Sequence, residues 1–100
     1  MAKNYPEFIT RLEKSDPRLF ESVTDIYDLS MSPGELDAKT KILICIALDA
    51  LTGAGEGVRV LSKIAKDMGI SAGQIAEALR LAYFVAGNPV LYAMKTAFEE

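Results

Sequence analysis

The side chains that most often carry chemistry are sparse in this chain. It has no histidine, so an imidazole base, a histidine metal ligand and a Ser–His or Cys–His pair are excluded within the chain. Its single cysteine, Cys45, lies among isoleucines, where burial raises the pKa of a thiol and makes it a poor nucleophile. Asp49, Glu56 and Tyr83 remain as candidate acids or bases, although such carboxylates are more often solvated surface groups. We expect no bound metal and no cofactor.

A glycine-rich segment, TGAGEG at residues 52–57, is the most unusual local feature. One interpretation is an anion-binding loop at a helix amino terminus, where free backbone N–H groups attract phosphates. Gly55, Gly57 and Arg59 would then be the candidate ligand-binding residues, since arginine can also hold a carboxylate in bidentate fashion. No strand precedes the segment and the Walker lysine pattern is absent, so a turn between two helices is favoured.

Caps, glycines and prolines divide the chain into about six helices, and no segment alternates like a strand. The first is capped near Asn4–Pro6 and the second starts at Asp16–Pro17. The third follows Asp37 and runs over residues 38–51, and the fourth ends at Gly69. The fifth opens with a Ser71/Gln74 capping box and stops at Gly87, and the sixth starts at Asn88–Pro89 and ends at Phe98. The sequence predicts an all-α fold.

Composition indicates one globular domain over residues 1–100, with half of the residues apolar and a quarter charged. The net charge of −3 and the thin spread of Lys and Arg argue against nucleic acid as a partner. The longest strictly apolar run, residues 42–48, is too short to span a membrane, and no signal peptide is recognisable. A lone cysteine excludes an internal disulfide framework, so the cytoplasm is the expected compartment.

Two segments are apolar around the whole helix circumference: residues 42–48 and residues 81–86. A helix of this kind must be covered on every face, and a chain of 100 residues offers little surface to do so. The apolar surplus therefore predicts an obligate oligomer.

Three pieces of sequence carry a resemblance to a known family. They are LDAKTK at residues 36–41, GISAGQIAEALRLA at 69–82 and AGNP at 86–89, and with their spacing they cover about two-thirds of the chain. The chain resembles the carboxymuconolactone decarboxylase family, which includes the alkylhydroperoxidase D-like proteins. The resemblance implies an all-helical fold, an AGNP turn, and assembly into homotrimers or homohexamers.

The family's peroxidase chemistry has no counterpart in these residues. Peroxidase-type members use a glutamate, a Cys-x-x-Cys pair and a histidine, in which the glutamate and histidine relay a proton and activate one thiolate. Aligned through LDAKTK and the Gly69 turn, these four positions fall on Ile42, Ala54, Gly57 and Leu61. Decarboxylase-type members keep histidines in this region, and this chain has none.

Three hypotheses follow. The first is an oligomeric small-molecule-binding protein without the family's peroxidase or decarboxylase chemistry. The second is a divergent enzyme on a lactone or keto-acid substrate that uses Asp49, Glu56 or Tyr83 as acid or base. The third is a scaffold or regulatory subunit of an active paralogue. Function depends on the site and not on the fold, so the sequence alone leaves all three open.

Overall fold

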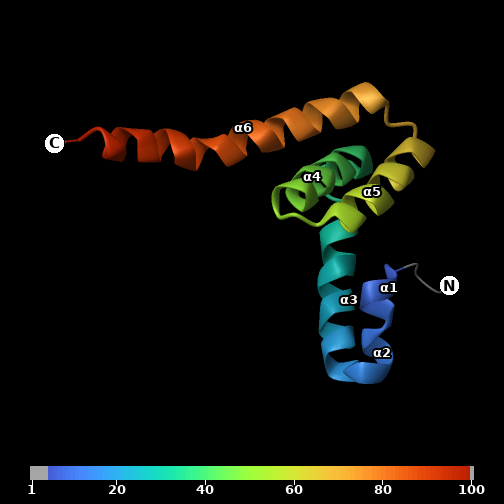
Figure 1. Cartoon of the computed structure of the whole chain (residues 1–100). Helices are drawn as coiled ribbons and strands as arrows, with labels where there is room; N and C mark the ends of the chain where they lie inside the picture. The colour runs from blue at the N-terminus through green and yellow to red at the C-terminus, as the bar shows by residue number, and fades with distance from the viewer. Residues whose placement is uncertain (1–4, 100) are drawn as a thin grey trace. The chain divides into compact units, whose positions relative to one another are not determined.

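The computed structural model describes residues 5–99, and within them every regular element is an α-helix (Figure 1). The predicted all-α class is confirmed. The chain divides into two compact units, Met1–Glu35 and Leu36–Glu100. Within the described residues, no helix is both long enough and apolar enough to cross a membrane.

The first unit contains α1 (Glu7–Thr10), α2 (Leu12–Ser15) and α3 (Pro17–Met31). Arg11, between α1 and α2, keeps helical dihedral angles, so these two elements form one nearly continuous stretch. The Asp16 carboxylate accepts the Leu19 N–H at 3.1 Å, which confirms the predicted cap of α3. The predicted cap at Asn4 lies outside the described residues. Tyr5 donates to Asp28 at 2.9 Å.

The second unit begins with α4 (Ala38–Leu51), which opens at the predicted cap. The Asp37 side chain accepts the Thr40 N–H at 2.7 Å. The hydrogen bonds from Thr40 lower the pKa of the Asp37 carboxyl below its ordinary value of 3.8, because they favour the charged form.

Left-handed glycines end both α4 and α5 (Gly55–Asp67). Gly53 has φ +81°, and the N–H of Ala54 reaches back to the carbonyl of Asp49 at 2.8 Å. Gly69 has φ +85°, and the N–H of the residue after it, Ile70, reaches the carbonyl of Ala65 at 2.9 Å. Both ends are Schellman motifs, which require a residue that tolerates positive φ. The 52–57 segment therefore contains the helix–helix turn favoured from the sequence, at residues 52–54, and its last three residues form the first turn of α5.

The last helix, α6 (Ala72–Ala97), corrects one predicted boundary. Its capping box between Ser71 and Gln74 is present as predicted. However, Gly87 and Pro89 lie inside α6, so the predicted stop at Gly87 and the AGNP turn are wrong. Gly87 has no positive φ and therefore does not terminate the helix. The helix α6 continues through Pro89 although proline lacks the N–H for a helical hydrogen bond.

Packing in the second unit is centred on α4, which contacts both α5 and α6. Ile46 and Ala65 are completely buried, and Ile42 and Ile70 nearly so. Other faces are not covered: Leu48 of α4 is 54% exposed and Tyr92 of α6 is 77% exposed. Beyond α4 and α5, the carboxyl-terminal half of α6 continues as a single helix (Figure 1). Exposed apolar faces of this kind are what the predicted oligomer would bury, but the structure of a single chain does not test that prediction.

Candidate functional site

Gly57, which the resemblance assigns to the second cysteine position, lies in a close contact between α4 and α5. The carboxylate of Asp49 lies directly over Gly57: a Cβ atom added to Gly57 would lie 2.9 Å from Asp49 Cγ and closer still to Oδ2. Real Cβ atoms do not approach other atoms so closely, so any side chain at position 57 requires Asp49 to move. The space that a thiol would fill is therefore taken by a carboxylate.

The local structure explains why Asp49 lies there. Its backbone carbonyl accepts the Ala54 N–H in the Schellman turn, which brings the start of α5 back against the end of α4. Gly57 is in the first turn of α5, one residue after Glu56. The short turn thus holds the carboxylate and the glycine together.

The other three residues that the resemblance assigns to catalytic positions have structural roles in this fold. Ile42 is 5% exposed and belongs to the core of the second unit. Ala54, in the position of the first cysteine, is the residue before α5 and closes the turn through its backbone N–H. Leu61 is a half-buried residue of α5. None of these side chains can donate or accept a proton.

Cys45 lies one helical turn before Asp49 on α4 and is half-buried. Burial, and then the negative charge of Asp49, raise the pKa of the Cys45 thiol above its ordinary value of 9.0, and Lys41 opposes this only in part. The thiol is consequently protonated at neutral pH. This agrees with the structural role expected from the sequence and not with a nucleophile.

Of the remaining candidates from the sequence, Glu56 and Arg59 are brought together and the others are not. Glu56 and Arg59 form an ion pair with each other at 3.6 Å, and their side chains are 75% and 80% exposed. Tyr83 is 85% exposed on α6. Gly55 faces open space, since a Cβ there would meet nothing within 4 Å. In residues 5–99, no hydrogen bond or ion pair joins any two of Asp49, Glu56 and Tyr83. These residues therefore do not form an acid–base pair in the described structure.

A groove between α4 and α6 was not anticipated from the sequence. It has a volume of about 310 Å³. Its lining is apolar at Leu43, Ile44, Ala47, Ala78 and Leu81, and polar at Thr40, Gln74 and Glu77. The spacing of these residues along each helix is that of a single face, the only signal in the sequence that could have identified them.

The groove and the contact between Asp49 and Gly57 lie on opposite faces of α4. Ala47 lines the groove, whereas Asp49, two residues later, lies about half a turn away and contacts Gly57 of α5. A ligand in the groove would therefore meet apolar side chains with a few polar groups, which is the usual lining of a small-molecule site. It would not meet the Asp49 carboxylate.

Comparison with known proteins identifies the family of this chain. Residues 17–100 match the model of the Carboxymuconolactone decarboxylase family. An uncharacterized protein of Methanocaldococcus jannaschii is 29% identical over 90 residues, which are 89% of this chain and 84% of the relative. A crystal structure of a protein from Methanobacterium thermoautotrophicum has the same fold, with a TM-score of 0.80 and 24% identity over 93% of this chain and 100% of that one. This chain belongs to the carboxymuconolactone decarboxylase family.

Proposed function

We propose that this protein is a homo-oligomeric small-molecule-binding member of its family, without the thiol peroxidase or histidine-dependent decarboxylase chemistry. Its ligand binds in the groove between α4 and α6. A small, mainly apolar molecule with one hydrogen-bonding end fits the lining. The apolar part would contact Leu43, Ala47 and Leu81, and the polar end would lie near Thr40, Gln74 and Glu77.

The observation that carries the loss of thiol chemistry is the contact between Asp49 and Gly57. A peroxidase site needs a thiolate there, a second thiol three residues away and a proton relay. Instead, a carboxylate fills the space of one thiol, and Ile42 and Leu61 replace the relay. Cys45 offers no substitute, because the pKa of its thiol is raised and the chain has no second cysteine to resolve a disulfide.

The polar end of the groove indicates which ligands are favoured. Glu77 is the only charged residue among those that line it. A carboxylate would meet the negative charge of Glu77, whereas a hydroxyl, amide or amine could donate a hydrogen bond to it. We therefore favour a neutral or cationic ligand over an acidic one.

Native mass spectrometry on gently purified protein tests the binding role. We expect an oligomer of this chain that carries an additional small mass. Ala47→Phe should remove that mass by filling the groove, since the alanine lines it. Ala38→Phe, on an exposed position on the opposite side of the same helix, is the matched control and should keep it. A small mass that Ala47→Phe leaves unchanged would show that the ligand binds elsewhere, and a bare monomer would contradict the proposal as a whole.

A further inference from the structure

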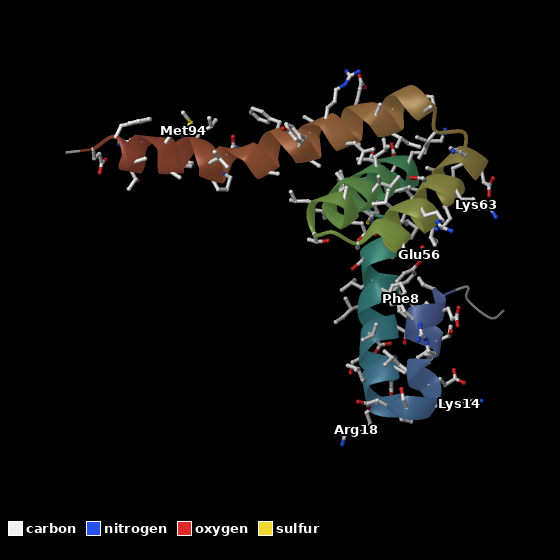
Figure 2. The ribbon with its side chains drawn as sticks, in the orientation of Figure 1. Phe8, Lys14, Arg18, Glu56, Lys63 and Met94 are labelled. Atoms are coloured by element: carbon white, nitrogen blue, oxygen red, sulfur yellow. The ribbon has the colours of Figure 1, made fainter. Side chains whose placement is uncertain are left out.

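The carboxyl-terminal half of α6 presents a long uncharged surface that nothing in the second unit covers. Between Arg80 and Lys95 the helix has no charged residue. Leu81, Phe84, Val85 and Tyr92 in this stretch are between 50% and 77% exposed. Figure 2 shows Met94 on the part of α6 that extends beyond α4 and α5. Exposed apolar patches of several hundred Å² mark interaction surfaces in soluble proteins.

One face of α6 joins this surface to the groove. Leu81 lines the groove, and Val85, Asn88, Tyr92 and Lys95 follow it at spacings of three and four residues. They therefore lie on the same side of the helix. We call the six residues Glu77, Leu81, Val85, Asn88, Tyr92 and Lys95 the α6 stripe. Its first two members flank α4, and the others continue past it.

The stripe cannot fold back onto the groove of its own chain. Lys95 is eighteen residues beyond Glu77 on one continuous helix, a rise of about 27 Å. The carboxyl-terminal part of α6 therefore cannot reach the groove of its own chain, whereas the α6 helix of a second copy can.

The stripe is complementary to itself when two copies run antiparallel. A two-fold axis between Ala86 and Gly87 places Leu81 opposite the second copy's Tyr92, and Val85 opposite its Asn88. The same register brings Glu77 near the second copy's Lys95, so the only two charges of the stripe are of opposite sign and meet at both ends.

The available area suits a second copy. An aromatic side chain buries about 150–250 Å², and Phe84 and Tyr92 are 66% and 77% exposed. With Leu81, Val85 and Leu91, the patch is of the same order as the roughly 800 Å² per partner of a specific interface.

We propose that two copies of this chain associate through their α6 stripes, with the two α6 helices antiparallel. Tyr92 and Lys95 of each copy then cover the groove of the other copy. The inference rests on the proposed function, because it assigns the closed form of the same groove. The ligand site is then open in a single chain and enclosed only in the pair.

Cross-linking tests the register. In a Cys45→Ser background, Glu77→Cys with Thr96→Cys places thiols opposite each other across the proposed two-fold axis. Thiols at these positions of one helix are about 28 Å apart, so a short bismaleimide can join them only between copies. Glu77→Cys with Met94→Cys is the control, because Met94 is half a turn away from Thr96. We expect covalent dimers from the first pair and few from the second.

Charge reversal tests the pairing independently. Glu77→Lys and Lys95→Glu should each raise the dissociation constant of the pair about tenfold, and the double variant should restore it. Lys63→Glu, on an exposed position of α5, should have no effect. This inference would be overturned if the protein is oligomeric, forms no cross-link, and has the same dissociation constant in both charge-reversal variants. The proposed homo-oligomer would not be contradicted by that result. A chain that is monomeric at all concentrations would overturn both.

Discussion

Replacing Ile46 by alanine is expected to lower the free energy of unfolding by about 2–5 kcal/mol. Ile46 is 0% exposed at the centre of α4, and the truncation removes buried methyl groups and leaves a cavity. Urea denaturation followed by circular dichroism measures the loss.

Leu48→Ala is the matched control on the same helix. Leu48 is 54% exposed, so its truncation should cost about 1 kcal/mol or less. A loss of about 1 kcal/mol or less for Ile46→Ala would mean that α4 is not buried on the Ile46 side, and the described core would then be wrong.

Gly57→Ala is expected to lack the stabilisation of about 0.5–1 kcal/mol that replacing a glycine inside a helix by alanine normally gives. The new Cβ would collide with the Asp49 carboxylate, so this side chain must rotate away from its place over Gly57. Removing the carboxylate with Asp49→Ala should restore the stabilisation, and a double-mutant cycle by thermal denaturation measures the coupling.

Gly55→Ala provides the control in the same turn of α5, where a Cβ meets nothing within 4 Å. It should be neutral or stabilising with and without Asp49. If Gly57→Ala stabilises the protein as much as Gly55→Ala does, the carboxylate does not occupy the space over Gly57, and the proposal that Asp49 fills the place of a thiol is refuted.

Local signals in the sequence were sufficient for most helix ends. Asp16, Asp37 and the Ser71/Gln74 box cap their helices through contacts three residues away, and Gly69 supplies a positive φ. These interactions join residues that are close together in the chain, so they can be predicted from the sequence. At residues 86–89 the same reasoning failed. Glycine and proline there permit a turn but do not require one, and α6 continues through them.

The candidate site was predictable only in part. Alignment to the family identified Ile42, Ala54, Gly57 and Leu61 as the replaced positions, because that inference needs spacing alone. The contact between Asp49 and Gly57 and the groove between α4 and α6 depend on how helices pack. A pattern along one chain does not specify the distance between side chains on two helices, so neither feature could be read from the sequence.

The most direct test of the central claim is a peroxide-consumption assay with hydrogen peroxide and an organic hydroperoxide, in the presence of a dithiol. It should be run at neutral pH and again near pH 9, since the pKa of the Cys45 thiol is raised above 9.0 and thiolate forms only in alkali. The account predicts a rate equal to that without protein at neutral pH, and no saturation with either substrate at any pH. Saturable dithiol-dependent turnover that Cys45→Ser abolishes would contradict it.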